Sequence, residues 1–385
     1  MRKLLSLVLC LAMAIGCVAF ASCGGKENDS DKDSTGSGVD YSSFKIAMVT
    51  DYGDITDQSF NQSTWEAVKK FGDEHNIQYK YYKPTGDSTQ ARVTSIDDAI
   101  EEGYNVIVTP GYAFAGALEE TAGKNPDVKF IAIDVGEGDF SKGYKLPANL
   151  TSFIYQEELP GYMAGYAAVK EGYKKLGFLG GMAVPAVVRY GYGFVQGAND
   201  AAKEMQIENE VTIEYVYGNK FAPDPKIKAY MATMFQKVDV VFACGGGIYI
   251  SACEAAKDIS ADKKIIGVDV DQSFIINKGY GEGRCITSAM KGLAATTLTA
   301  LDETTKGNFS KYAGKISTLG IVDGENPANN YVQLPMDTWT MTKFTVNDYK
   351  ALVKDLKDGK KTVSGATTTA PTVAITVNYA SATIV

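Results

Sequence analysis

The run Phe44-Lys45-Ile46-Ala47-Met48-Val49-Thr50 is short and apolar, and it ends in the polar residues Asp51-Tyr52-Gly53. A helical pattern follows after a short loop, because Trp65, Val68 and Phe71 recur at the spacing of one helix face. A buried strand followed by an amphipathic helix is the first half of a βαβ unit. The run therefore predicts a parallel sheet covered by helices.

The same alternation of apolar runs and helical segments recurs along the chain, and it restarts after Gly172. One of the expected helices is Arg189 to Met205. Strands are expected at 44–50, 106–109, 129–133, 175–179, 211–216, 239–243 and 264–268. Two such series predict an α/β protein with two parallel, doubly wound sheets. The length agrees, because roughly 360 residues beyond an N-terminal leader are too many for one ordinary core.

The leader begins with Arg2 and Lys3, which precede an apolar run that ends at Phe20. Ala21-Ser22-Cys23 then offers small residues to a signal peptidase. Residues 1–22 are therefore expected to be a lipoprotein signal peptide, and Cys23 the lipidated N-terminus. The alternatives are cleavage before Cys17 and an uncleaved membrane anchor, although the apolar run is barely long enough to span a bilayer.

A polar segment rich in Gly, Ser, Asp and Lys follows Cys23, and it cannot bury enough apolar surface to fold. Residues 23–43 are therefore expected to be a flexible tether. The lipid on Cys23 would hold the folded part at the extracytoplasmic face of the cell membrane.

Composition and charge exclude several classes of function. The formal net charge is −8 and the sequence has no basic patch, so nucleic acid is not expected as a partner. None of the glycine clusters has the spacing of a Walker-type phosphate loop. Cys244, Cys253 and Cys285 lack the spacing of metal ligands or of a disulfide framework, so we expect buried thiols, no metal site and no cofactor.

Polar residues and glycines follow several predicted strands, at the edge where doubly wound sheets bind their ligands. Asp51 and Asp134 end strands of the first series, and Gly245-Gly246-Gly247 and Asp269 end strands of the second. The glycines would let a ligand approach the backbone, or they form tight turns. Asp269 and Lys291 would make a charged pair that holds vicinal hydroxyls, or an ordinary salt bridge.

Ser59 and Gln62 have the spacing of a capping box, which predicts that a helix begins there. Phe60 and Asn61 then lie in its first turn, facing the expected crevice. A phenyl face beside a carboxamide suits a planar ring with hydrogen-bonding edges, such as a nucleobase. The alternative is that Phe60 is a core contact and Asn61 is solvated.

Several motifs together resemble one known family. They are Asp57 to Gln62, the strand end at Asp134, Gly161 to Gly165, Gly267 to Gln272 and Ser288 to Lys291. From about Phe44 to Leu334 the chain is similar to the basic membrane proteins, the substrate-binding lipoproteins of nucleoside-import ABC transporters. The resemblance implies a type I periplasmic-binding-protein fold, in which two Rossmann-like lobes close over a ligand cleft by a hinge motion.

The resemblance also implies how a nucleobase would be bound. Phe60 would stack on the base, and Asn61 and Asp134 would hydrogen-bond its edge. The family usually has an Arg-Phe pair where this chain has Arg189-Tyr190, so Tyr190 would supply the second aromatic face.

The resemblance implies a ribose site as well. Asp269 and Lys291 would hold the ribose together with the backbone of Gly245 and Gly246. Asp51 would line the first lobe's side. Metal ligands and catalytic residues are not part of the implied site.

The resemblance divides the chain into two discontinuous lobes. Lobe I is expected to hold 44–152 and about 287–312. Lobe II is expected to hold 153–286 and about 313–360. The tail, 361–385, is rich in Thr, Ala and Val, and the sequence assigns it no role.

The expected function is that of a non-enzymatic, monomeric binding protein that captures a nucleoside, with a purine preferred. It would deliver this ligand to an ABC permease and its cytoplasmic ATPase subunits. The alternatives are a surface lipoprotein that senses the ligand and a sugar-binding protein of the same fold. An enzyme is disfavoured, because the single histidine, His75, lies near the end of a predicted helix. We expect this histidine to be exposed to solvent rather than to act as a catalytic base.

Overall fold

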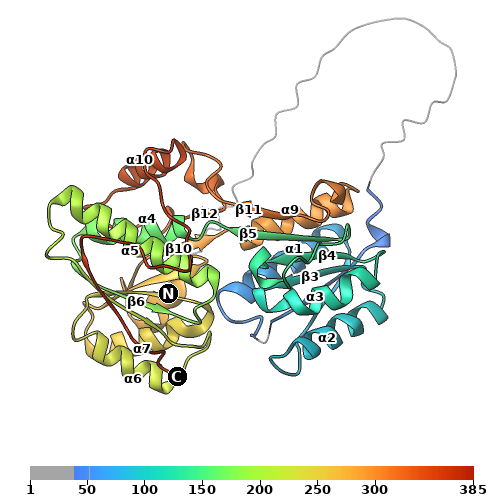
Figure 1. The fold of residues 1–385 in the computed structure, drawn as a ribbon, viewed down its shortest axis with the longest axis horizontal. Helices are drawn as coiled ribbons and strands as arrows, with labels where there is room; N and C mark the ends of the chain where they lie inside the picture. The colour runs from blue at the N-terminus through green and yellow to red at the C-terminus, as the bar shows by residue number, and fades with distance from the viewer. Residues whose placement is uncertain (1–38, 52) are drawn as a thin grey trace, which may run out of the picture. The chain divides into compact units, whose positions relative to one another are not determined.

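The computed structural model of the protein describes residues 39–51 and 53–385. The expected signal peptide and Cys23 lie outside the described residues. Residues Val39–Val385 form one compact unit, drawn in colour in Figure 1. Within the described residues, no helix is both long enough and apolar enough to cross a membrane.

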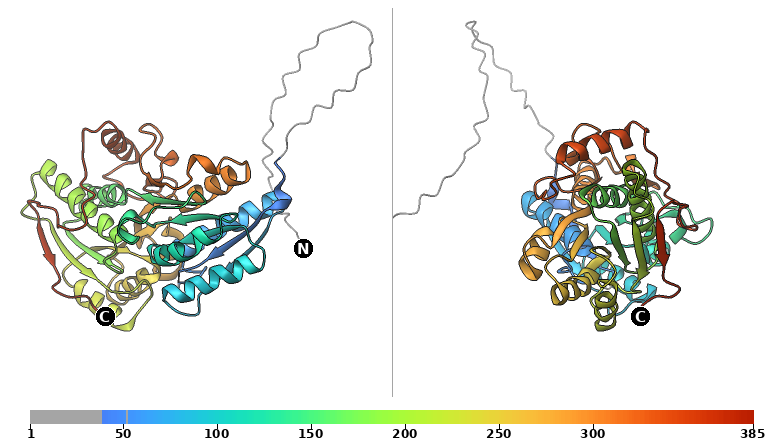
Figure 2. Two further views of the ribbon diagram at one scale, coloured as in Figure 1. Left: turned by 45° about the vertical axis from the view of Figure 1, so that its right-hand side comes forward. Right: turned by 90° about the vertical axis from the view of Figure 1, so that its left-hand side faces the viewer.

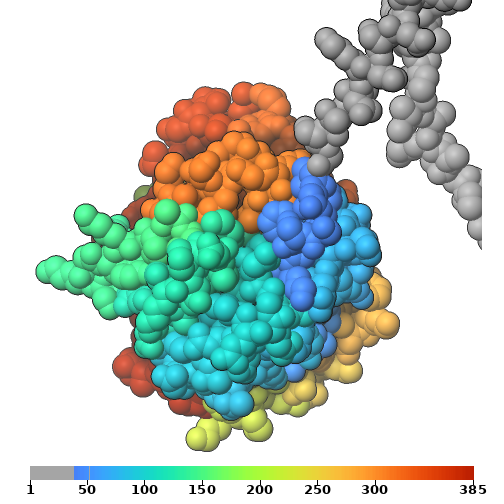
Figure 3. Space-filling view, turned by 90° about the vertical axis from the view of Figure 1, so that its right-hand side faces the viewer, coloured from blue at the N-terminus to red at the C-terminus, as the bar shows by residue number. Residues whose placement is uncertain are grey.

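The first sheet has six strands in the order β11-β5-β4-β3-β1-β2, and each neighbouring pair is parallel. Its strands are β1 (Lys45–Val49), β2 (Gln78–Tyr82), β3 (Val106–Pro110), β4 (Lys129–Ile133), β5 (Leu150–Tyr155) and β11 (Ile316–Leu319). The helices that cover it are α1 (Phe60–His75), α2 (Thr89–Glu101), α3 (Ala115–Thr121) and α9 (Leu293–Thr305). We call this sheet with its helices lobe I, whose outer face is viewed in Figure 3.

Strand β1 shows why lobe I needs helices on both faces. Alternate side chains of a strand point to opposite faces of its sheet. Ile46 and Met48 belong to the core under α1 and α9, whereas Ala47 and Val49 belong to the core under α2 and α3. A continuous apolar strand is therefore buried on both faces, as parallel sheets require.

The second sheet has seven strands in the order β12-β10-β9-β8-β6-β7-β13. Strand β12 runs antiparallel to β10, and the other neighbouring pairs are parallel. Its strands are β6 (Lys175–Gly180), β7 (Thr212–Tyr217), β8 (Val240–Cys244), β9 (Lys264–Asp269), β10 (Cys285–Lys291), β12 (Val332–Gln333) and β13 (Thr376–Tyr379).

Six helices cover the second sheet, and we call this sheet with its helices lobe II. On one face lie α4 (Glu158–Glu171), α5 (Pro185–Met205) and α10 (Val346–Lys357). On the other lie α6 (Pro225–Met234), α7 (Tyr249–Ile259) and α8 (Ser273–Tyr280). Single 3-10 turns lie at Tyr41–Ser43, Tyr112–Phe114, Ala122–Lys124, Glu137–Asp139, Gly246–Ile248, Phe309–Lys311 and Pro327–Asn329. Figure 2 shows the two lobes from two further sides.

Within the described residues, the chain passes between the two sheets three times. It leaves the first sheet after Tyr155, returns after Lys291, and leaves again after Leu319. Thr287 to Lys291, which we expected in lobe I, therefore pairs within the second sheet. The exact lobe boundaries remain a prediction, but the expected fold of two doubly wound lobes is confirmed.

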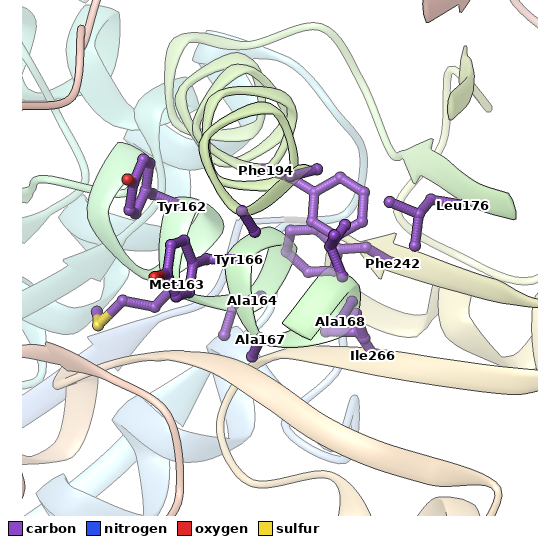
Figure 4. Packing of buried hydrophobic residues seen from close by; sticks show 14 of the residues in the cluster. Tyr162, Met163, Ala164, Tyr166, Ala167, Ala168, Leu176, Phe194, Phe242 and Ile266 are labelled. Carbon is purple, nitrogen blue, oxygen red and sulfur yellow. The ribbon is translucent and has the colours of Figure 1, made fainter. Parts of the chain in front are cut away.

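Helices α4 and α5 approach each other closely because glycines meet backbone at their interface. A Cβ atom on Gly161 would lie 2.1 Å from the Tyr190 carbonyl oxygen, and one on Gly197 would lie 1.9 Å from that of Tyr162. The aromatic and aliphatic side chains around this contact fill the core shown in Figure 4. The close packing places the first turn of α4 against Tyr190 and Gly193 of α5, and Tyr190 lines the cleft.

Candidate functional site

A cleft of about 310 Å³ lies between the carboxyl ends of the strands of the two lobes. Among the described residues, eight of the nine predicted ligand-binding residues line it, and Asn61 is the exception. The eight are Asp51, Phe60, Asp134, Tyr190, Gly245, Gly246, Asp269 and Lys291. This volume is at the lower end of the range of small-molecule sites.

Two aspartates occupy corresponding places in the two lobes. Asp134 directly follows β4 of the first sheet, and Asp269 ends β9 of the second. Both have left-handed backbone, with φ of 60° and 65°. Asp tolerates this conformation better than most residues, and such backbone gathers at functional sites. Each lobe thus contributes one carboxylate from a sharply turned strand end.

The Lys291 ammonium group lies among three carboxylates that come from both lobes. It forms an ion pair with Asp134, and its Nζ lies 3.8 Å from Asp269 Oδ1 and 3.6 Å from Glu157 Oε1. Burial by itself would lower the pKa of Lys291, but the neighbouring carboxylates outweigh it and raise the pKa. Lys291 is therefore a permanent buried cation that links the lobes.

Glu157 is a residue of this cluster that the sequence analysis did not select. Its side chain is fully buried, and its Oε2 accepts a hydrogen bond of 2.6 Å from Arg189 Nε. Burial, followed by the charge of Asp134, raises the pKa of Glu157 to about 7. The signal for Glu157 is its position after strand β5, which the sequence analysis did not predict as a strand.

Replacing Glu157 by glutamine is expected to flatten the pH dependence of stability. The folded-state pKa of Glu157 is raised, so the folded protein binds a proton that the unfolded chain releases, and stability falls as pH rises from about 4.5 to about 7. Glu157→Gln should remove a difference on the order of 1 to 3 kcal/mol between pH 5 and pH 8, since one pKa unit equals about 1.4 kcal/mol. Thermal unfolding at both pH values measures it, and equal slopes for variant and parent would contradict this role.

Aromatic rings from both lobes reach the cleft. Phe60, in the first turn of α1, is half-buried, and Lys291 Nζ lies 4.8 Å from its ring centre. Tyr190 of α5 is buried, and its ring packs edge-on against Phe242 at 5.9 Å. Within the described residues, the buried Tyr190 hydroxyl has no hydrogen-bond partner. A planar ligand can therefore meet one aromatic side chain from each lobe.

Phe221 is a further aromatic residue at the cleft, and it is not among the residues predicted from the sequence. A Cβ atom on Gly245 would lie 2.8 Å from the Phe221 ring, and Gly245 has φ of 134°. A Cβ atom on Gly246 would lie equally close to the Phe221 backbone. These glycines thus make room for Phe221 as well as lining the cleft. The signal for Phe221 is its place in the loop that follows β7.

The predicted capping box at the start of α1 is wrong. The helix begins at Phe60, as expected, but the Ser59 side chain does not cap it. Ser59 Oγ instead donates a 2.6 Å hydrogen bond to Asp269 Oδ2, across the cleft. The Asp57 carboxylate caps the helix by accepting from the backbone N–H groups of Asn61 and Gln62 at 2.9 and 3.1 Å. The Ser59 hydroxyl therefore bonds a carboxylate of lobe II instead of capping the helix.

Asn61 does not line the cleft itself, but it contacts Asp51, which does. Its Nδ2 donates to Asp51 Oδ1 at 3.2 Å and to Asp57 Oδ2 at 3.1 Å. Its Oδ1 is buried and, within the described part of the chain, lacks a hydrogen-bond partner. Asn61 therefore orients Asp51 in this arrangement, and its direct contact with a ligand stays a prediction.

The three cysteines of the described chain are buried free thiols, as predicted. Cys253 and Cys285 lie in the core of lobe II, and Cys244 ends β8 at the wall of the cleft. Burial raises the pKa of the Cys244 thiol well above its usual value. Cys244 is therefore a small apolar lining residue rather than a reactive thiol.

Two doubly wound lobes with a cleft at their strand ends are the architecture of the two-lobed ligand-binding proteins. The profile of the Bmp family, described as "ABC transporter substrate-binding protein PnrA-like", matches residues 44–333. The chain belongs to this family, as its motifs predicted. The family consists of proteins that bind substrates for ABC transporters rather than of enzymes.

Similar proteins agree with this membership. The chain is 28% identical over 369 residues to the ABC transporter nucleoside-binding protein BmpA of Lactococcus lactis, covering 91% of this chain and 98% of that protein. It is 29% identical over 293 residues to basic membrane protein B of Borreliella burgdorferi, covering 74% and 82% of the two chains.

A solved structure confirms the fold. A solute-binding protein of an ABC transporter system from Aeropyrum pernix superposes with a TM-score of 0.64 at 20% identity, covering 82% of this chain and 86% of that chain. A second, from Conexibacter woesei, has a TM-score of 0.63 at 20% identity and covers 84% and 99%. The type I periplasmic-binding-protein architecture is thereby confirmed.

Proposed function

We propose that the protein captures a nucleoside, preferably a purine nucleoside, in the cleft between its lobes, and that it does so without chemical conversion. It then delivers the nucleoside to an ABC permease with cytoplasmic ATPase subunits. A lipid on Cys23 anchors it at the extracytoplasmic face of the membrane, and it acts as a monomer. The name of the Lactococcus relative, a nucleoside-binding protein, supports this ligand class.

The observation that carries the proposal is the division of the cleft into an aromatic part and a charged part. Phe60 and Tyr190 line the cleft from opposite lobes, and aromatic side chains suit a base. Asp269 and Lys291 offer an acceptor and a donor beside them, which suits vicinal hydroxyls. A nucleoside carries both a planar base and vicinal hydroxyls in one molecule. A free sugar has the hydroxyls alone.

Calorimetric titration of the Val39–Val385 unit tests the proposal. The protein is first unfolded and refolded, because ligands copurify with enclosed sites. Adenosine, guanosine, inosine, uridine, ribose and the free bases are then titrated. Tight one-to-one binding of a nucleoside, with ribose and free base both weak, is expected. Tight binding of ribose alone would instead make it a sugar-binding protein.

A sensing role differs from import in its partner rather than in its ligand. If genes for a permease and an ATPase lie next to the gene of this protein, import is favoured, and deletion of those genes should abolish nucleoside uptake. Uptake that survives in a strain lacking this protein would favour sensing.

Replacing Phe60 by alanine is expected to weaken nucleoside binding by about 1 to 3 kcal/mol, the usual contribution of base stacking on an aromatic side chain. Phe274→Ala is the matched control, because Phe274 is 72% exposed and lies outside the cleft. Calorimetry of both variants with the best nucleoside measures the difference. Unchanged affinity in Phe60→Ala would show that the ring does not stack on the base.

Nucleotides are expected to bind far more weakly than nucleosides. The cleft is lined by the carboxylates of Asp51, Asp134, Glu137, Asp139 and Asp269, against the cations of Arg189 and Lys291. Both cations are already paired with carboxylates. A 5′-phosphate would meet net negative charge, so the affinity should fall by about a hundredfold or more. Titration with a nucleoside and its monophosphate measures this, and equal affinities would contradict it.

A further inference from the structure

The C-terminal tail, residues 361–385, is fixed to lobe II at several points along its length, and we call it the strap. Figure 1 draws it in dark red, from α10 to the C-terminus. Its strand β13 extends the second sheet by pairing in parallel with β7. Farther along, the Ile384 N–H donates to the Tyr217 carbonyl at 3.0 Å. The strap lies outside residues 44–333, which the family profile matches.

The contacts of the strap with α5 show that it runs up this helix and back. Lys361 pairs with Glu204 near the end of α5 at 2.6 Å. Ser364 exchanges two hydrogen bonds with Gln196, of 3.0 and 2.9 Å. The return is fixed by Asn199, whose Oδ1 accepts from the Ala374 N–H at 2.8 Å. Residues 365–373 therefore form a loop over the first half of α5.

This loop reaches the cleft. Thr367 is one of the residues that line it, as are Val184 to Val187 at the start of α5. Gly365 lies against the Glu158 carboxyl group at the start of α4, since a Cβ atom there would be 3.2 Å from it. Thr367 is half-buried, whereas Thr368 and Thr369 are exposed. One residue of the loop is thus turned into the site, and its neighbours are not.

We propose that Thr367 is a specificity-determining residue of the ligand site, which the strap brings to the cleft that Tyr190 also lines. This inference rests on the proposed nucleoside function and adds to it. The start of α5 carries Arg189 and Tyr190, on the side of the cleft assigned to the base. A threonine there offers one hydroxyl that donates or accepts, next to a methyl group that limits the size of the ligand. The strap therefore selects among bases through hydrogen bonding and fit.

Three variants of the Val39–Val385 unit test this role. Thr367→Trp fills the wall of the cleft and should weaken binding of the best nucleoside by about tenfold or more, because a well-packed site does not accept the added volume. Thr369→Trp, in the same loop but exposed, is the matched control and should bind within about twofold of the parent. Thr367→Val removes the hydroxyl at almost unchanged shape and should change the order of preference among adenosine, guanosine and inosine.

Thermal unfolding accompanies each titration, and all three variants are expected to melt as the parent does. Equal affinities and equal base preference in the parent and all three variants would overturn the role of Thr367 while leaving the proposed function standing. Failure of the parent itself to bind any nucleoside would overturn the proposed function, and this inference with it. A loss of binding in Thr369→Trp equal to that in Thr367→Trp would assign the effect to the loop as a whole and overturn the specific role of Thr367.

Discussion

Replacing Lys291 by methionine is expected to abolish ligand binding and to destabilise the protein by about 3 to 5 kcal/mol at pH 8, as removal of one partner from a buried ion pair does. Lys291 is 4% exposed and lies among the carboxylates of Asp134, Glu157 and Asp269. Methionine keeps much of the volume but removes the charge. The carboxylates of Asp134 and Asp269 then lose their lysine partner, and of the three only Glu157 keeps an ion pair within the described residues, with Arg189.

The loss of stability in Lys291→Met should be larger at high pH than at low pH. Burial already raises the pKa values of Asp269 and Glu157, and removal of the cation raises them further. For a carboxyl group whose folded-state pKa is raised, the destabilisation is complete above the folded-state value and vanishes as pH falls to the unfolded-state value, near about 4. The difference in stability between Lys291→Met and the parent should therefore become smaller as the pH is lowered from 8 to 5.

Urea unfolding at the two pH values measures this effect. Lys306→Met is the matched control, because Lys306 pairs with Asp302 at 2.7 Å but is 45% exposed. Its removal should leave stability close to that of the parent, because surface ion pairs contribute little. A Lys291→Met variant as stable as this control at pH 8 would show that the carboxylates do not depend on the buried cation.

Most of the strands that the sequence predicted are buried at nearly every position, although β7 is only partly buried. Strand β8 has the sequence Val-Val-Phe-Ala-Cys and is buried at each position, so its apolar composition was sufficient to predict a strand. Strand β2, Gln-Tyr-Lys-Tyr-Tyr, lies at the edge of the first sheet and is largely exposed, so its pattern is that of a surface segment. Strand β5 mixes Thr and Ser with apolar residues. Because β5 was not predicted, Glu157 at its carboxyl end was not recognised as part of the site.

The site was predictable where a residue follows a buried strand, and not where its partner comes from the other lobe. Asp134 and Asp269 were found from their positions at strand ends. The hydrogen bond from Ser59 to Asp269 joins residues 210 positions apart, and local spacing carried no trace of it. Thr367 lies in a segment whose composition is that of a tail, and the contacts with α5 that fix it are equally remote in sequence. Tertiary contacts, rather than local propensity, decide such cases.

Replacing Asp269 by asparagine is expected to weaken nucleoside binding by about 1.5 to 3 kcal/mol, the usual contribution of a hydrogen bond to a charged group. Asp269 is 5% exposed and lies beside Lys291, so its hydrogen bonds to ribose hydroxyls would form away from water. Asparagine keeps the shape and one acceptor oxygen for the Ser59 hydroxyl. Lys291 retains Asp134 and Glu157 as partners, so the loss of stability should be small compared with that of Lys291→Met.

A ligand series turns this variant into a thermodynamic cycle. The parent and Asp269→Asn are each titrated with a ribonucleoside and with its 2′-deoxy and 3′-deoxy forms. If Asp269 holds a ribose hydroxyl, the parent should discriminate against one deoxy form and the variant should not, so the two changes are strongly non-additive. Asp271→Asn is the control, because Asp271 bonds the Ser273 N–H and the Thr338 hydroxyl outside the cleft. Discrimination that survives unchanged in Asp269→Asn would transfer the ribose contact to another group, and Lys291, which donates to the same region, would then be the residue that selects the sugar.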